Sequence, residues 1–250
     1  RTFAIAAASV TAASAVGFRR HAECSLDSKQ YNDVHDCIGF IWGNGKGIEP
    51  IRSSQFAGRK LKCLAFGPTF SAALCEKGNI WVWPSKDFKP LPVKSNFSFS
   101  NVAVGQSKSY ALSKDGRIFA WSNNDSNSIE EIKCIKNGWF GTEKAVHISA
   151  FEDNFAFVTN HGKVYSSGRG DCGQLGNGQM VAHSKGFELM QLPRDDKACM
   201  VAVGESHTAV LTRAGRVLVC GSDASLQLGR KESVAVWLRG DERAEARCSA

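Results

Sequence analysis

The run Gly168-Arg-Gly-Asp-Cys-Gly173 has the G-x-G-x-x-G spacing of a dinucleotide-binding loop. In that fold the run opens a helix, and the amides of its first turn bind a pyrophosphate. Here the polar, glycine-rich stretch 174–178 follows instead of a helical pattern. We therefore predict a loop at this position and no bound cofactor. The tripeptide Arg169-Gly-Asp171, which serves adhesion in some extracellular proteins, is better explained as turn chemistry.

A second possible chemistry is hydrolysis, with His207 as the base and Ser206 and Asp223 as its partners. No serine lies in a G-x-S-x-G nucleophile elbow, so we predict no catalytic residues and a protein that is not an enzyme. The six histidines lack metal-ligand spacing, and the nine cysteines include no Cys-x-x-Cys pair. We therefore predict no metal site, and we expect most cysteines to pack as small apolar residues.

The elements that carry these residues form a repeat. Four times a glycine lies five residues before the same strand position, and four short apolar runs end eleven residues upstream of these glycines. The pairs of glycine and strand position are Gly78/Trp83, Gly116/Trp121, Gly162/Ser167 and Gly215/Cys220. The upstream runs end at Gly67, Gly105, Phe151 and Gly204. A constant spacing of this kind indicates a repeat architecture.

The pattern of each unit predicts a short first strand, then a second strand, a glycine-containing turn and a third strand. In the second unit, the apolar runs 109–113 and 118–121 flank Lys114-Asp-Gly-Arg117, an Asp-Gly hairpin turn. An eroded fifth unit ends in Phe40-Ile-Trp42-Gly43, with Cys37 at the position of the turn glycine. Units of roughly 40 to 50 residues with several short strands are typical of β-propeller blades, which bury both faces only by stacking.

The last two units carry a family resemblance. Residues 201–221, followed by Leu226-Gln-Leu-Gly229, resemble a repeat of the regulator of chromosome condensation family, as does 164–168 with Gly173-Gln-Leu-Gly176. The resemblance covers roughly residues 39–230 and implies a propeller, usually of seven blades. It also implies that His207 makes a structural bond between blades. Some members of this family catalyse nucleotide exchange on small GTPases, and others bind chromatin.

The net charge of +7 is modest, and the basic residues are dispersed along the chain. Dispersed charge gives little support to a nucleic-acid surface, so nucleic acid is not a predicted partner. With 250 residues the chain is long enough to bury a full core. We predict an all-β fold, a β-propeller of about four to five visible repeat units, preceded by an N-terminal α-helical segment.

That segment, residues 1–22, contains no acidic residue, and an alanine-rich stretch from Phe3 to Phe18 precedes Arg19-Arg20. Three interpretations are a mitochondrial targeting peptide, a secretory signal and a retained membrane anchor. As a helix the apolar stretch would be about 24 Å long, short of a full span. A fourth interpretation of residues 1–22 is an alanine-rich helix that lies on the propeller. We favour a short anchor or a helix packed in a membrane assembly, so the predicted domains are 1–22 and a propeller over 23–250.

These features predict a non-enzymatic scaffold or accessory subunit on a mitochondrial membrane protein complex, at the inner membrane and in a respiratory or related assembly. Its partners would be other protein subunits and the membrane. The alternative is an exchange factor or chromatin-type regulator of the resembled family. Two insertions, 84–96 and 122–144, depart from the repeat, and Trp139-Phe140 in the second would suit an interface. The predicted partner-binding residues are Trp139, Phe140, Phe3, Phe18, Arg19 and Arg20.

Overall fold

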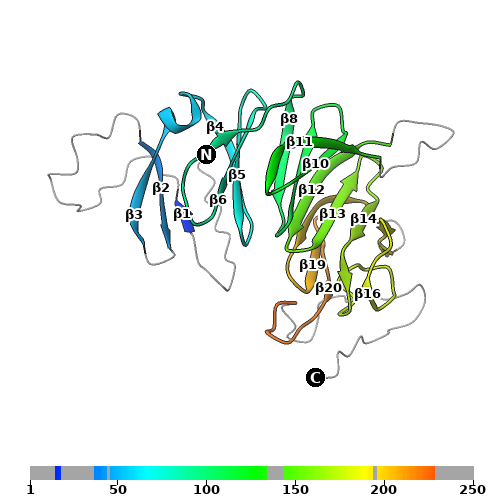
Figure 1. Cartoon of the computed structure of the whole chain (residues 1–250). Coiled ribbons are helices and arrows are strands. Elements are labelled where there is room, and N and C mark those ends of the chain that lie inside the picture. Colours follow the sequence, from blue (N-terminus) through cyan, green and yellow to red (C-terminus); the bar gives the residue numbers. More distant parts are fainter. Residues whose placement is uncertain (1–14, 18–36, 44–45, 134–142, 194–195, 229–250) are drawn as a thin grey trace.

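The computed structural model describes residues 15–17, 37–43, 46–133, 143–193 and 196–228, and within them the fold is all-β. The strands form antiparallel sheets that follow one another in chain order, from the blue sheet to the orange one in Figure 1. The described part of the chain contains no α-helix, only the short 3-10 turn η2 (Ser53–Phe56). The predicted β-propeller architecture is confirmed.

Five successive sheets correspond to the five units predicted from the sequence, and we call them blades 1 to 5. Blade 1 contains β1 (Ala15–Gly17), β2 (Cys37–Gly43) and β3 (Lys46–Arg52). Blade 2 contains β4 (Leu61–Phe66), β5 (Phe70–Cys75), β6 (Ile80–Pro84) and β7 (Leu91–Pro92). Blade 3 contains β8 (Phe99–Val104), β9 (Lys108–Ser113), β10 (Ile118–Ser122) and β11 (Asp125–Ile132).

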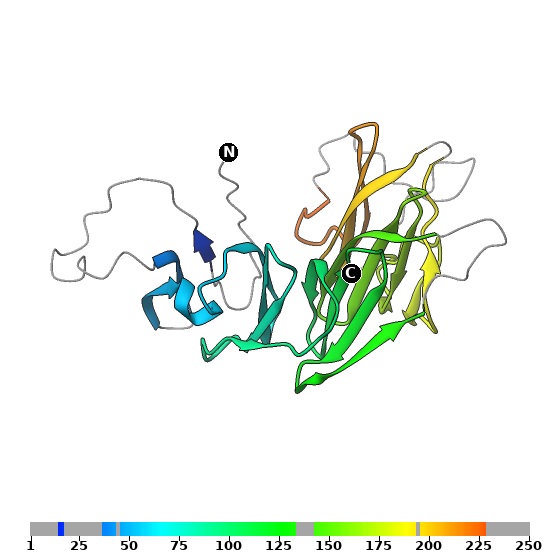
Figure 2. The same ribbon diagram turned by 90° about the horizontal axis from the view of Figure 1, so that it is seen from above.

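Blade 4 carries the longest insertion among the described residues. Its strands are β12 (Ala145–Phe151), β13 (Asn154–Thr159), β14 (Val164–Ser167) and β17 (Glu188–Leu189), and the inserted pair is β15 (Arg169–Gly170) with β16 (Val181–His183). Blade 5 contains β18 (Ala198–Val203), β19 (His207–Thr212) and β20 (Val217–Gly221). Seen from above in Figure 2, the blades run across the molecule from β1–β7 on one side to β8–β20 on the other.

The core lies in the seams between blades, because each sheet has two apolar faces to bury. One cluster fills each seam. Blades 1 and 2 meet at Phe56 and Trp81, blades 2 and 3 at Leu74 and Phe99, blades 3 and 4 at Leu112 and Phe157, and blades 4 and 5 at Val158 and Val210. These residues are each at most 5% exposed. Neighbouring blades therefore stabilise one another.

The turn glycines connect the blades as well as closing the hairpins. Gly78, Gly116 and Gly162 have φ values of +90°, +89° and +79°, a region that favours glycine. The carbonyl of each accepts a hydrogen bond from the first residue of the next blade. The donors are the amides of Phe99, Ala145 and Ala198, at 3.0, 3.1 and 2.9 Å.

The predicted N-terminal helix is wrong where the structure describes it. Ala15–Gly17 forms β1, which pairs antiparallel with β2, with Ala15 opposite Trp42 and Gly17 opposite Phe40. The edge of β2 offers backbone groups that a strand can satisfy, and the β-branched Val16 suits an extended backbone. The rest of residues 1–22 lies outside the described residues. Among the described residues, no helix is both long enough and apolar enough to cross a bilayer.

Candidate interaction surface

Strand order places two kinds of loop at opposite edges of the blades. The glycine turns 76–79, 114–117, 160–163 and 213–216 join the second and third strands of blades 2 to 5. Because neighbouring strands are antiparallel, these turns lie at one end of each blade, and the loops between first and second strands lie at the other. We call the first end the hairpin-turn edge and the second the opposite edge.

The hairpin-turn edge is rich in cations. The residue directly after the turn glycine is Asn79 in blade 2 but Arg117, Lys163 and Arg216 in blades 3 to 5. Further cations lie in the same turns or in the residues just before the next blade, namely Lys77, Lys114, Lys144, Lys197 and Arg213. The basic residues that are dispersed in the sequence are thus brought together by the fold, which the sequence reasoning missed. The recurring cation after the turn glycine was the available signal.

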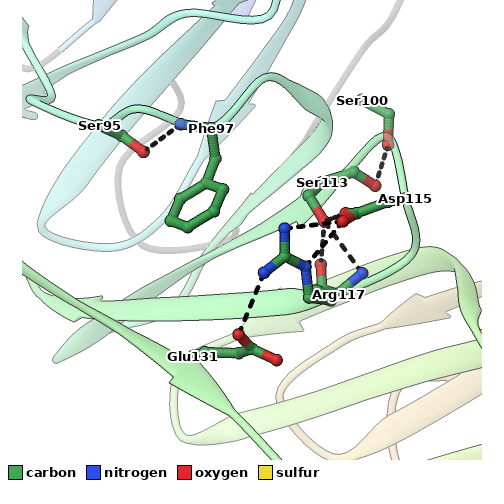
Figure 3. Close-up of polar contacts among 7 residues, drawn as sticks. All are labelled: Ser95, Phe97, Ser100, Ser113, Asp115, Arg117 and Glu131. Carbon is green, nitrogen blue, oxygen red and sulfur yellow. Dashed lines mark hydrogen bonds and ion pairs between the residues drawn. The ribbon is translucent and has the colours of Figure 1, made fainter.

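Among these cations, Arg117 contacts both aromatic rings and carboxylates (Figure 3). Its guanidinium carbon lies 4.8 Å from the centre of the Phe97 ring and 5.6 Å from that of Phe119. Its nitrogens lie 2.7 Å from Asp115 Oδ2 and 3.4 Å from Glu131 Oε2. Phe97 is 38% exposed. Arginine and aromatic residues are both enriched at protein interfaces, and here they lie side by side.

The equivalent cations of blades 4 and 5 bind acids in the connections before their own first strands. Lys163 Nζ lies 3.6 Å from Glu143 Oε2, and Arg216 forms an ion pair with Asp196, whose side chain is 2% exposed. Arg213 Nη2 donates to the carbonyl of Asn160 in blade 4, at 2.7 Å. These contacts fix the turns in place, so the edge is a pre-organised surface rather than a set of loose loops.

The ion pair between Arg117 and Asp115 makes the stability of the hairpin-turn edge sensitive to acid. The hydrogen bond from Arg117, with another from Ser113, lowers the pKa of Asp115 from 3.8 to about 2. Because the folded-state pKa is depressed, the carboxylate stabilises the fold above pH 3.8, and this stabilisation is lost as the pH falls towards 2. We expect Asp115→Asn to flatten the fall in melting temperature between about pH 4 and pH 2. Parallel melting curves of the two proteins across that range would contradict the prediction.

The opposite edge carries several acidic residues. Its loops carry Glu152, Asp153 and Glu205, and the loops that follow the third strands add Asp171 and Asp223. Partial burial, with the nearby carboxylate of Glu205, raises the pKa of Glu152. Asp171 is bound within its own loop, since Gln174 Nε2 donates to it at 3.0 Å and Arg169 Nη2 at 2.7 Å. The hairpin-turn edge therefore gathers cations at recurring positions, and the loops of the opposite edge contribute several acids beside cations such as Arg169 and Lys185.

The residues singled out in the sequence have different outcomes. Phe3, Phe18, Arg19, Arg20, Trp139 and Phe140 lie outside the described residues, so their assignment as partner-binding stays a prediction. The G-x-G-x-x-G run forms β15 and a turn with no helix after it, as predicted.

His207 is half-buried against Gly204 of its own unit, and no hydrogen bond of its imidazole occurs in the described part of the chain. The histidine that does bridge blades is His147, whose Nδ1 accepts from the amide of Val201 at 3.4 Å.

Comparison with known proteins agrees with this fold. The family model described as regulator of chromosome condensation (RCC1) repeat matches residues 161–211. The human probable E3 ubiquitin-protein ligase HERC3 is 31% identical over 138 residues, which cover 52% of this chain and 13% of that protein. The X-linked retinitis pigmentosa GTPase regulator homolog of Caenorhabditis elegans is 31% identical over 144 residues, covering 53% of this chain and 10% of that protein. The chain thus matches only a small part of these curated relatives.

Two solved structures have the same fold at low identity. Prp20p from Saccharomyces cerevisiae superposes with a TM-score of 0.59 at 20% identity, covering 73% of this chain and 52% of that one. Human WBSCR16 superposes with a TM-score of 0.54 at 18% identity, covering 74% and 59%.

Proposed function

Because the chain belongs to the regulator of chromosome condensation repeat family, we propose that it is a non-enzymatic scaffold or accessory subunit that docks a protein partner. The observation that carries the proposal is the hairpin-turn edge, where Arg117, Lys163 and Arg216 recur at one repeat position and are held by hydrogen bonds or ion pairs. These ion pairs fix the row, and further positive charge beside it comes from the exposed side chains of Lys77, Lys114, Lys144 and Lys197. Such an edge suits a partner with an acidic surface, because complementary charge raises the association rate and selects the partner. The exposed ring of Phe97 would add apolar contact at the same edge.

We place this partner, again as a proposal, in a mitochondrial membrane protein complex at the inner membrane. The support is compositional, namely the absence of acidic residues from residues 1–22 and the basic pair Arg19-Arg20. In the same proposal, Phe3 and Phe18 contact the membrane or its proteins, and Trp139 and Phe140 add to the partner interface.

The test is affinity isolation of the tagged protein from detergent-solubilised mitochondria and other membranes, followed by native gels. We expect recovery with a large membrane complex. Lys77→Glu with Lys114→Glu, both exposed at the hairpin-turn edge, should weaken the interaction about tenfold at low salt, because rim charges mainly set the association rate. Lys108→Glu with Lys185→Glu makes the same change in net charge away from that edge and should leave binding within about twofold. Equal effects of the two pairs would contradict a specific role for the hairpin-turn edge.

A second candidate function is regulation of a small GTPase or of chromatin. The observation that favours it is the likeness to proteins named GTPase regulators, including 36% identity over 91 residues to the human X-linked retinitis pigmentosa GTPase regulator. The structure of Prp20p is also described with its binding properties to Gsp1p and histones. In the isolation experiment, recovery of a small GTPase that excess GTP releases would support this candidate over the membrane scaffold.

A further inference from the structure

One face of blade 5 differs from the equivalent faces of blades 2 to 4. The first residue of the third strand is Ile80, Ile118 and Val164 in those blades, and it is 1%, 2% and 0% exposed. The equivalent residue of blade 5, Val217, is 56% exposed. In the three earlier blades this position packs in the seam with the blade that follows. Val217 therefore occupies a position that is buried between blades elsewhere, but no following blade covers it in the described part of the chain.

The surrounding residues show the same difference. Leu211 pairs with Val217 and takes the place of the fully buried Leu74 and Val158, yet it is only partly buried. Met200, opposite Leu211 on the inner strand, is 48% exposed. A Cβ atom added at Gly162 would lie 2.6 Å from the next blade, whereas one at Gly215 would meet nothing within 4 Å. We call Met200, Ala202, Ala209, Leu211 and Val217 the blade 5 face.

The sequence after the described residues repeats the pattern that covers such a face elsewhere. Val102-Ala-Val104 in β8 and Val201-Ala-Val203 in β18 are inner strands, and their valines pack on the preceding blade. Val234-Ala-Val236, followed by Trp237-Leu238, has the same residues. We propose that residues 234–238 pack on the blade 5 face as an inner strand, with Val234 and Val236 in the seam against Leu211 and Val217.

The connection is long enough for this arrangement. Five residues, 229–233, lie between Leu228, the last described residue, and Val234. Extended, they span up to about 17 Å, comparable with the length of a five-residue strand. The segment can therefore pass along the edge of blade 5 and enter the seam. All five residues from 234 to 238 are apolar, which is typical of a strand that is buried on both faces.

The test compares aspartate substitutions in the full chain. Val217→Asp and Val236→Asp should each lower the melting temperature by about 10 °C, since each would bury an unpaired charge. The control is Val146→Asp, because Val146 is a strand valine with 48% exposure and lies outside the blade 5 face; it should shift the melting temperature by less than about 2 °C. The double variant Val217→Asp/Val236→Asp should lose less than the sum of the two single losses, because the residues share one contact.

Hydrogen exchange of the unaltered protein is an independent test of the proposal, because it does not depend on whether the variants fold. Amides of residues 234–238 should be protected to the same degree as those of β18, at every protein concentration. A Val217→Asp protein as stable as Val146→Asp, or unprotected amides at 234–238, would overturn the proposal. Protection that appears only at high protein concentration would also overturn it, because it would assign the blade 5 face to a second copy of the chain.

Discussion

Replacing Phe157 by alanine is expected to lower the free energy of unfolding by about 3–5 kcal/mol, the usual cost of removing a buried phenylalanine side chain. Phe157 is 0% exposed in β13 and packs in the seam between blades 3 and 4. Its ring centre lies 5.2 Å from that of Tyr165 and 5.5 Å from that of Phe187. The surrounding strands are hydrogen-bonded into two sheets and cannot close over the cavity, so most of the loss should remain.

Urea unfolding followed by circular dichroism measures this loss. The matched control is Phe97→Ala, since Phe97 is a phenylalanine with 38% exposure at the edge of the neighbouring blade. We expect it to cost less, about 1–2 kcal/mol, because part of the Phe97 ring already lies in water. Because repeat proteins hold each unit mainly through its neighbours, Phe157→Ala should also separate the unfolding transition into two steps. Equal costs for the two variants would show that the seam repacks around the missing ring.

The repeat was predictable because its signal lies within each unit. The Asp-Gly turn at 115–116 and its counterparts specify hairpins locally, and strands such as Trp81–Trp83 are apolar on both faces because both faces are in seams. The positions of the hairpins in blades 2 to 5 followed from these patterns alone, whereas Cys37, aligned with the turn glycine in the first unit, lies in β2. The packing of one blade on the next also followed, since a single blade cannot bury such strands.

The charged edge was not predictable in the same way. Arg117 and Arg216 are far apart in sequence, and they share an edge only because their turns occupy the same place in successive blades. Composition alone gives the net charge but not the positions at which these cations gather. The strand at Ala15–Gly17 was missed for a related reason, because its partner, β2, lies more than twenty residues away and alanine-rich composition favours a helix locally. A long-range pairing overrode that local preference.

The second large effect is expected for Gly162→Ala. Gly162 has a φ of +79°, which costs an alanine about 1–2 kcal/mol. The new methyl group would also lie 2.6 Å from Cβ and 2.9 Å from Cα of Lys197, at the start of blade 5. The Cα cannot move without displacing the first strand, whose residue Ala198 donates its amide to the carbonyl of Gly162 at 2.9 Å. We expect a total loss of about 3 kcal/mol or more in the free energy of unfolding, measured by urea denaturation.

The control separates the two causes of that loss. Gly173 has nearly the same φ, +77°, but a methyl group there would meet nothing within 4 Å. Gly173→Ala should therefore cost only the backbone contribution of about 1–2 kcal/mol. The difference between the two variants measures the contact between the turn of blade 4 and the start of blade 5. If both variants lost the same stability, the turn glycines would serve their own hairpins only, and the coupling between blades would rest on the apolar seams alone.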